Sequence, residues 1–394
     1  MGEAILALNA GSSSLKFALF RLGDGRPVAI CRGELEDVNG AGHFRARDAG
    51  GVLLADKAAP DPVRDADAAL AFLLDWTDKH LGDDTLACVG HRIVHGGRDF
   101  TAPVRIDDAV MRALDALCPL APLHQPHNLA GVRAVSRARP NLIQTASFDT
   151  AFHAGHDAIV ARFAIPRRFE GDGVRRYGFH GLSYDYISHR LAALDPALAR
   201  GRVIAAHLGN GASLCALANG KSVDTTMGFS ALDGLVMGTR CGLLDPGVLL
   251  YLQDHAGLDS KGVSDLLYKQ SGLLGVSGIS GDVRALLASD KPEARDALDL
   301  FAFRAAREAA AMTATLGGLD GIVFSAGIGE NAAPVRAAIC ERLAWLGVSL
   351  DTAANAKGGE SKISTADSSV TVWIVPTDEE ATIVRDAISL LDYQ

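Results

Sequence analysis

The chain has 394 residues, 48% hydrophobic and 22% charged, which is a composition typical of globular proteins and a length that suits two domains. Its net charge of −9 argues against a general nucleic-acid surface, and no apolar run is long enough to span a membrane. The six cysteines are scattered without a CxxC pair, so we expect reduced thiols in a cytoplasmic protein with neither nucleic acid nor membrane as a partner.

The first predicted elements are two strands joined by a turn of small residues. The strand at 4–8 ends on Asn9, the chain turns through Gly11 and three serines, and a strand at 14–20 carries Lys16. Small residues let backbone N–H groups approach phosphate oxygens, and Lys16 adds a positive charge. A strand follows the turn where a P-loop would have a helix. The pattern therefore favours a phosphate-binding hairpin over a plain one.

Helices and short strands follow in alternation. We expect helices at 65–81, 107–117 and 128–138, and strands beginning at 89 and at 142. The second of these strands ends at Asp149, and ligands of α/β sheets gather at that edge, although a turn or a helix cap would also use an acid there. Arg92 lies in a loop that punctuates the other strand, where its forked donors suit a carboxylate or a phosphoryl group, or equally a salt bridge.

Histidines form three pairs with spacings of three or four residues. Zinc binding would require both members of a pair on one helix face, yet these histidines lie in loop-like segments beside proline and glycine. We therefore interpret them as structural side chains rather than ligands: His91 with His95, His124 with His127, and His153 with His156.

The opening pattern recurs near the middle of the chain. A strand at 203–208, a turn at 209–211, a strand at 212–217, an Asn-Gly hairpin and a strand at 221–225 repeat its order. The repeat predicts a duplication, with two α/β domains related by a pseudo-twofold axis.

Two further side chains lie among glycines. His180 stands between Gly178 and Gly181, and its imidazole could donate to a transferring phosphoryl group. Arg240 follows Gly238 and Thr239 and has little core to cover, so it suits an anion or an interdomain salt bridge.

The last third of the chain adds a third glycine turn. A helix at 298–316 and a buried strand at 321–327 lead into a predicted loop, Gly327–Asn331, before a helix near Pro334. This loop also fits a dinucleotide fingerprint, but three glycine turns at strand ends favour a nucleotide site. A strand at 370–375 precedes a helix at 378–391, which we expect Thr377 to cap.

Taken in order, eight segments resemble the acetate kinase family across the whole chain: LNAGSSSLKF, HRIVHGG, FDTAFH, YGFHG, HLGNGAS, LDGLVMGTR, GIGEN and PTDEE. The resemblance implies an α/β fold of duplicated ribonuclease-H-like domains of the actin/sugar-kinase type, with mixed central sheets and an active site in the interdomain cleft. It implies an N-terminal domain of residues 1–150 with 381–394, a C-terminal domain of 151–380 that holds the nucleotide, and a homodimer. The reaction would be Mg²⁺-dependent transfer of a phosphoryl group between ATP and acetate, giving ADP and acetyl phosphate, with Mn²⁺ as an alternative ion.

The resemblance also assigns roles to individual residues. Arg92 and Arg240 would hold the carboxylate and the phosphoryl group, His180 would share the transition-state charge, and Asp149 would orient Mg²⁺, because acetate has no proton to lose near neutral pH. Asn9 and Glu379 would hold the metal region. The acetate pocket would be lined by Arg92, Val94, Leu123, Phe179 and Ala231. The nucleotide site would comprise Lys16, His207, Leu208, Gly209, Asn210, Gly211, Asp282, Val283, Arg284, Gly327, Ile328, Gly329, Glu330 and Asn331.

Two positions depart from the family pattern. Ala231 stands where a proline commonly lines the methyl pocket, so a widened pocket and a preference for propionate are an alternative. Asp378 replaces a more frequent asparagine and would alter the metal geometry slightly. A non-catalytic actin-like nucleotide-binding protein is a further alternative, although it would not need Arg92, Arg240 and His180 together. A dehydrogenase would need an acidic ribose ligand about 20 residues after the Gly327 motif, and none is evident.

Overall fold

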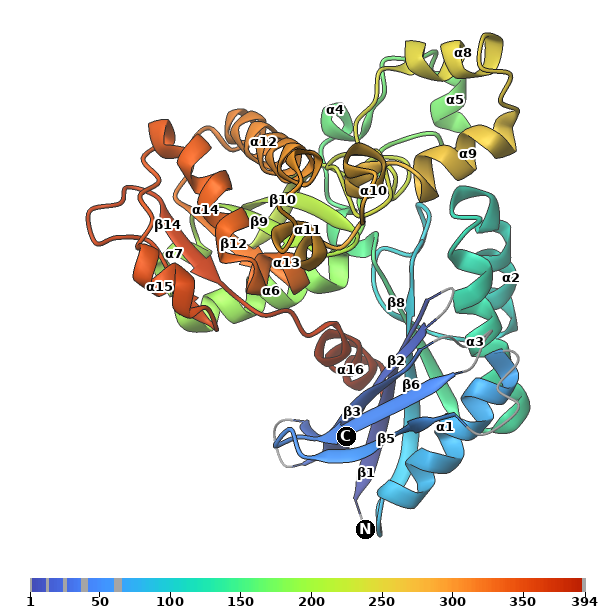
Figure 1. Ribbon diagram of the computed structural model, residues 1–394. Coiled ribbons are helices and arrows are strands. Elements are labelled where there is room, and N and C mark those ends of the chain that lie inside the picture. The colour runs from blue at the N-terminus through green and yellow to red at the C-terminus, as the bar shows by residue number, and fades with distance from the viewer. Residues whose placement is uncertain (1, 12–13, 24–26, 37–41, 60–65, 392–394) are drawn as a thin grey trace. The chain divides into compact units, whose positions relative to one another are not determined.

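The structure, a computed structural model, describes residues 2–11, 14–23, 27–36, 42–59 and 66–391 (Figure 1). The chain divides into two compact units: unit 1 holds the residues up to Phe152 and those from Asp378 onward, and unit 2 runs from His153 to Thr377. Within the described residues no helix combines the length and the apolar character that crossing a membrane requires. The predicted turn residues Ser12 and Ser13 lie outside the described residues.

Unit 1 is built on one mixed sheet. In its described part the sheet has eight strands in the order β5-β4-β3-β2-β1-β6-β8-β7. Strand β1 is antiparallel to β2 and parallel to β6, which is in turn parallel to β8. The strands are β1 (Glu3–Ala10), β2 (Ser14–Leu22), β3 (Val28–Glu36), β4 (His43–Asp48), β5 (Leu53–Ala58), β6 (Thr85–Ile93), β7 (Val104–Arg105) and β8 (Ile143–Phe148).

Helices cover both faces of the centre of this sheet, which explains why β1 is apolar without alternation. Its residues from Ala4 to Leu8 are all at most 1% exposed. Helices α1 (Ala66–His80) and α3 (Gln125–Ala138) supply one core, and α2 (Asp108–Ala116) packs on α3. Helix α16 (Glu379–Leu390) packs on β1, β6 and β8. Its approach requires a glycine, because a Cβ at Gly90 would lie 2.5 Å from Ile383 Cγ2.

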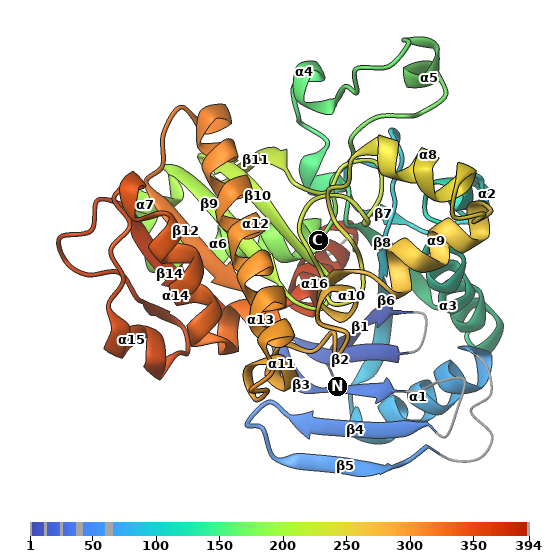
Figure 2. The same ribbon diagram turned by 45° about the horizontal axis from the view of Figure 1, so that its top comes forward.

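Unit 2 has a second mixed sheet. Its strands, in the order β11-β10-β9-β12-β14-β13, are β9 (Arg202–Leu208), β10 (Ala212–Ala218), β11 (Lys221–Thr225), β12 (Gly321–Ser325), β13 (Ser361–Lys362) and β14 (Thr371–Ile374). The long helix α12 (Pro292–Leu316) packs on β9, β10 and β11, while α6 (Gly181–Leu194) covers the other face (Figures 1 and 2). The remaining helices are α4 (Ala158–Ala161), α5 (Arg168–Gly171), α7 (Pro196–Ala199), α8 (Pro246–Asp254), α9 (Ser260–Lys269), α10 (Gly272–Ser277), α11 (Val283–Leu287), α13 (Ala326–Asn331), α14 (Ala333–Arg342) and α15 (Thr352–Lys357).

The two sheets repeat one topology. Strands β3-β2-β1-β6-β8 of unit 1 match β11-β10-β9-β12-β14 of unit 2, with the same antiparallel and parallel partners at corresponding places. The duplication predicted from the two glycine turns is therefore confirmed, although few residues are shared between the copies.

Two local predictions were wrong. Residues Gly327–Asn331 form most of helix α13 rather than a loop. Only the first residue, Ala326, takes a left-handed backbone (φ 62°), which sets the abrupt turn from strand to helix. The N-cap of α16 is Asp378, not Thr377: its carboxylate accepts from Ala381 N at 3.0 Å, and a carboxylate suits the positive end of the helix dipole better than a hydroxyl.

Candidate active site

Arg92 and Asp149 meet at the carboxyl end of parallel strands in unit 1. Ile93 of β6 pairs with Phe148 of β8, so the polar residues beside them lie at one sheet edge. Arg92 donates from Nε to Asp149 Oδ1 at 2.9 Å and from Nη2 to Oδ2 at 2.6 Å. The Asp149 side chain is buried, and this forked pair compensates the cost of burying its charge.

Asn9 extends this pair into a chain of four polar side chains. Its Oδ1 accepts from Arg92 Nη1 at 2.9 Å, and its Nδ2 donates to Glu379 Oε2 at 2.9 Å. Both the oxygen and the nitrogen of the Asn9 amide thus form hydrogen bonds. The hydrogen-bonded groups follow in the order Glu379 carboxylate, Asn9 amide, Arg92 guanidinium, Asp149 carboxylate. The structure brings together the four predicted residues Asn9, Arg92, Asp149 and Glu379.

The charges of this cluster influence one another. Burial opposes the charge on Arg92, but the contact with Asp149 outweighs it, so the pKa of the guanidinium lies above its ordinary value. Burial, and next the neighbouring Glu379, raise the pKa of Glu380. Three of the five N–H donors of Arg92 serve Asp149 and Asn9, which leaves two for a ligand.

The donor types of this cluster fit a magnesium ion brought by a nucleotide. Mg²⁺ in such sites takes one or two carboxylates, and phosphate oxygens and waters complete its shell. Asn9 supplies an amide oxygen and Glu379 a carboxylate oxygen. Asp149 is connected to Asn9 through two hydrogen bonds of Arg92. No group of three or more His, Cys, Asp or Glu suited to a metal occurs in the described part of the chain. Asp378 does not point its charge there, because it caps α16 and pairs with Arg32 at 3.0 Å.

Lys16 lies directly across the strand pair from Asn9, in β2. Lys16 is exposed and lines a pocket of about 400 Å³, together with Arg32, Arg45 and Arg47.

Of the predicted acetate-pocket residues in this unit, Val94 is buried, with its N–H donating to Asn128 Oδ1 at 3.0 Å, while Leu123 is 38% exposed. Asn128, which sequence reasoning missed, also donates to Ala10 O at 2.6 Å.

In unit 2, His180 and Arg240 converge on Gly211. A Cβ on Gly211 would lie 3.3 Å from His180 Nε2 and 3.6 Å from Arg240 Nη1, so a glycine leaves this point open to both groups. The imidazole of His180 stacks on His207, with ring centroids 4.2 Å apart and planes 20° from parallel. Its Nδ1 is 2.8 Å from Ser213 Oγ.

The Arg240 side chain joins the two ends of the loop from Ala231 to Arg240 through a backbone carbonyl. Arg240 Nη1 donates to Ala231 O at 3.0 Å, a contact that any residue at 231 could make. Phe179, predicted to line the acetate pocket, is buried. The carbonyl oxygen of residue 231 thus holds Arg240, whichever side chain stands at that position.

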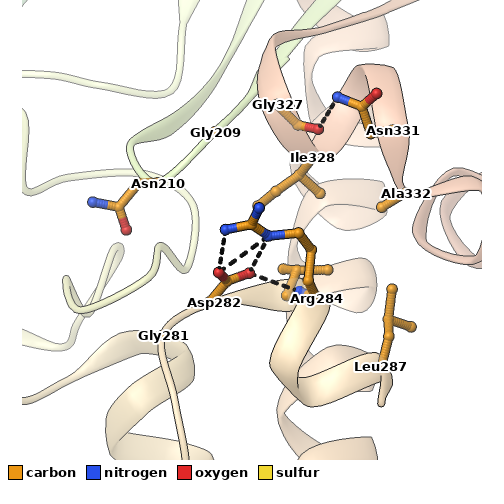
Figure 3. Close-up of a pocket in the computed structure, with 11 residues that line it drawn as sticks. Gly209, Asn210, Gly281, Asp282, Arg284, Leu287, Gly327, Ile328, Asn331 and Ala332 are labelled. Atoms are coloured by element: carbon orange, nitrogen blue, oxygen red, sulfur yellow. Dashed lines mark hydrogen bonds and ion pairs between the residues drawn. The ribbon is translucent and has the colours of Figure 1, made fainter. Parts of the chain in front are cut away.

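A pocket of about 480 Å³ lies among the predicted nucleotide residues (Figure 3). The glycine turn after β9, the start of α11 and helix α13 surround it. Eight predicted residues line it: Gly209, Asn210, Asp282, Val283, Arg284, Gly327, Ile328 and Asn331. Sequence reasoning missed three others, namely Gly281, Leu287 and Ala332.

The other predicted nucleotide residues of unit 2 lie outside the walls of this pocket. Glu330 turns its carboxylate to Thr377, whose N–H it accepts at 3.2 Å, and burial raises its pKa. His207 is fixed by Ser183, whose Oγ lies 2.7 Å from its Nδ1. Leu208 is fully buried. Gly211 and Gly329 are likewise absent from the lining.

Arg336, another residue that the sequence did not indicate, stabilises helix α13 by donating to its backbone. Its Nη1 donates to Gly329 O at 2.8 Å and to Glu330 O at 2.9 Å, and its Nε donates to Asn355 Oδ1 at 2.7 Å. The side chain is buried among neutral acceptors, and burial lowers its pKa. Its positive charge lies at the carbonyl end of α13, where the helix dipole favours it.

Two sheets with one strand order, each ending in polar residues at the carboxyl edge, define the class: this is a duplicated α/β kinase fold, which solved acetate and propionate kinases share. The chain belongs to the Acetokinase family, whose sequence model matches residues 4–385. An acetate kinase from Rhodopseudomonas palustris (strain TIE-1) is 48% identical over 397 residues, covering 100% of this chain and 99% of that protein.

Solved structures are similar over the same extent. The crystal structure of Porphyromonas gingivalis acetate kinase is 36% identical, with a TM-score of 0.87, and the match covers 99% of this chain and 100% of that one. A propionate kinase from Francisella tularensis is 35% identical, with a TM-score of 0.91 and the same coverage.

Proposed function

We propose that this chain is an acetate kinase that transfers the γ-phosphoryl group of ATP reversibly to acetate, giving ADP and acetyl phosphate. The proposal is supported by family membership and by one geometric observation: His180 Nε2 and Arg240 Nη1 converge on the side-chain-free point at Gly211. An imidazole and a guanidinium close to one point suit a phosphoryl group whose equatorial oxygens carry charge.

In the proposed mechanism an acetate oxygen attacks the γ-phosphorus as the bond from that phosphorus to the β,γ-bridging oxygen breaks. The carboxylate is a weak nucleophile that needs no deprotonation, so catalysis rests on alignment and charge neutralisation. Unit 2 contributes His180 and Arg240 toward the phosphoryl oxygens. Unit 1 contributes Arg92, whose two remaining N–H donors suit the carboxylate of acetate.

Asp149 is proposed to act as an orienting carboxylate. Both of its oxygens accept from Arg92, an arrangement that suits an orienting role better than that of a proton acceptor. Asn9 and Glu379 are the residues proposed to hold Mg²⁺, which when bound would neutralise phosphate charge. The pocket of Figure 3 is the proposed place of the adenosine, with Asn210, Asp282 and Ile328 among its walls.

Propionate is the second candidate substrate. Ala231 stands where a larger ring would narrow the methyl pocket that we propose from Val94, Leu123 and Phe179. One extra methylene in an apolar pocket changes binding by only about 1–3 kcal/mol, so the shape of the pocket decides the preference. We also propose a homodimer, as the family resemblance implies; light scattering after gel filtration measures the mass directly.

A hydroxamate assay with ATP, Mg²⁺ and acetate tests the proposal. Acetyl hydroxamate should form, in an acetate-dependent manner, and Arg240→Ala should suppress it. Binding of ADP without any acetyl phosphate would favour the non-catalytic alternative. Propionyl hydroxamate forming faster than acetyl hydroxamate at equal concentrations would reassign the substrate.

A further inference from the structure

A buried polar cluster in unit 2, centred on Ser222 of β11, has no place in the proposed chemistry. Ser222 Oγ lies 2.7 Å from His153 Nδ1, 2.7 Å from His156 Nε2 and 3.2 Å from Cys215 Sγ. The other nitrogen of His153, Nε2, lies 3.0 Å from the carbonyl oxygen of Phe179. The cluster therefore ends on the peptide that joins Phe179 to His180.

The hydrogen bonds of this cluster fix the protons of both histidines. A carbonyl oxygen only accepts, so His153 Nε2 carries the proton and donates to Phe179. Burial lowers the pKa of His153 to about 3 and that of His156 to about 4, so both rings are neutral near pH 7. His153 Nδ1 then accepts from the Ser222 hydroxyl, which in turn accepts from His156 Nε2. Ser222 thus sets the tautomer that makes His153 a donor.

The peptide that receives this hydrogen bond needs support. His180 has φ of 59°, a left-handed conformation that side chains disfavour, and Gly178 has φ of 85°. The His153 ring also lies against Gly178, where a Cβ would be 2.5 Å from its Cδ2. His153 therefore contacts the turn on both sides of Phe179.

We propose that His153 is a positioning residue for His180. Its Nε2–H holds the Phe179 carbonyl, and the held peptide directs the imidazole of His180 toward Gly211 and Arg240. The inference rests on the proposed function, because it acts through a residue assigned to the phosphoryl group.

Two substitutions separate the hydrogen bond from the packing. Glutamine places an amide nitrogen near the position of Nε2 and can still donate to Phe179, whereas asparagine reaches only the position of Nδ1 near Ser222. We expect His153→Gln to retain kcat within about threefold. His153→Asn should lower kcat about 10–100-fold, as losses of orienting hydrogen bonds do, while the Kd for ADP stays unchanged. The matched control is His189→Asn on the exposed side of α6, which should behave as wild type.

A double-mutant cycle shows whether the effect passes through His180. In a His180→Ala background, His153→Asn should cause almost no further loss of kcat. An equal loss in both backgrounds, or an equal loss in His153→Gln and His153→Asn, would overturn the inference. Nitrogen NMR shifts of the His180 ring give a readout without turnover: they should change in His153→Asn, and unchanged shifts refute the role. Absence of acetyl phosphate in the wild type would instead refute the proposed function.

Discussion

Replacing Arg92 by methionine would remove the guanidinium from the chain of polar side chains in unit 1 and keep an apolar stem. Asp149 is 1% exposed and accepts from Arg92 at 2.9 and 2.6 Å, so the variant leaves its charge buried and unpaired. Breaking a buried pair in this way costs roughly 3–5 kcal/mol. A domain of this size loses roughly 2–4 °C per kcal/mol. Calorimetry should therefore show a fall in the Tm of unit 1 of roughly 6–20 °C.

A second variant separates stability from catalysis. Arg92→Met combined with Asp149→Asn removes both charges, so most of the lost Tm should return. Turnover in the hydroxamate assay should remain at least about 10²-fold below wild type, because losing one directed donor costs about 10²–10³-fold. A double variant as unstable as Arg92→Met would show that the unpaired carboxylate is not the cause. Near-wild-type turnover in Arg92→Met would remove this arginine from the mechanism.

Three other outcomes follow from the site. Arg240→Ala should lower kcat/KM for acetate about 10²–10³-fold and leave the Kd for ADP, measured by calorimetry, within about twofold; a weakened Kd would place Arg240 in nucleotide binding instead. Wild type should use propionate within roughly tenfold of acetate, and Ala231→Pro should depress propionate selectively; equal rejection by both proteins would mean that neighbouring side chains fill the space. Burial lowers the pKa values of His91, His95, His153 and His156 to about 3–4, against about 6.5 in the unfolded chain. The free energy of unfolding should therefore be highest above pH 6.5 and fall below it by up to about 5 kcal/mol per pH unit. A urea midpoint that does not change between pH 7 and 5 would contradict this.

The sequence was most informative where local pattern determines structure. The strand–turn–strand order around Gly11 and Gly209 predicted the duplicated sheets, because period, turn residues and strand length are all local properties. The same reasoning failed at Gly327–Asn331. Two glycines in five residues suggested a loop, yet helix α13 forms there, and the distant Arg336 donates to two of its carbonyls.

Residues that act through distant partners could not be predicted. Arg336 lies in an ordinary helix, and its partner Asn355 is 19 positions away. Asn128 contacts Ala10 across 118 positions. Glu330 belongs to a motif with a nucleotide pattern but turns toward Thr377. A motif identifies which segments are special, whereas the direction of each side chain follows from the packing of segments far apart in the chain.

The division of the chain has a consequence for how the protein is made. Unit 2 is one continuous stretch, His153–Thr377, inserted between the two parts of unit 1. Domains fold as units while the ribosome extends the chain, so unit 2 can be complete while the sheet of unit 1 still lacks α16. Until that helix emerges, Gly90 has no Ile383 above it and Asn9 has no Glu379 to bind. The nascent enzyme therefore completes its chain of polar side chains last, and a polypeptide that ends before Glu379 lacks the carboxylate that Asn9 binds.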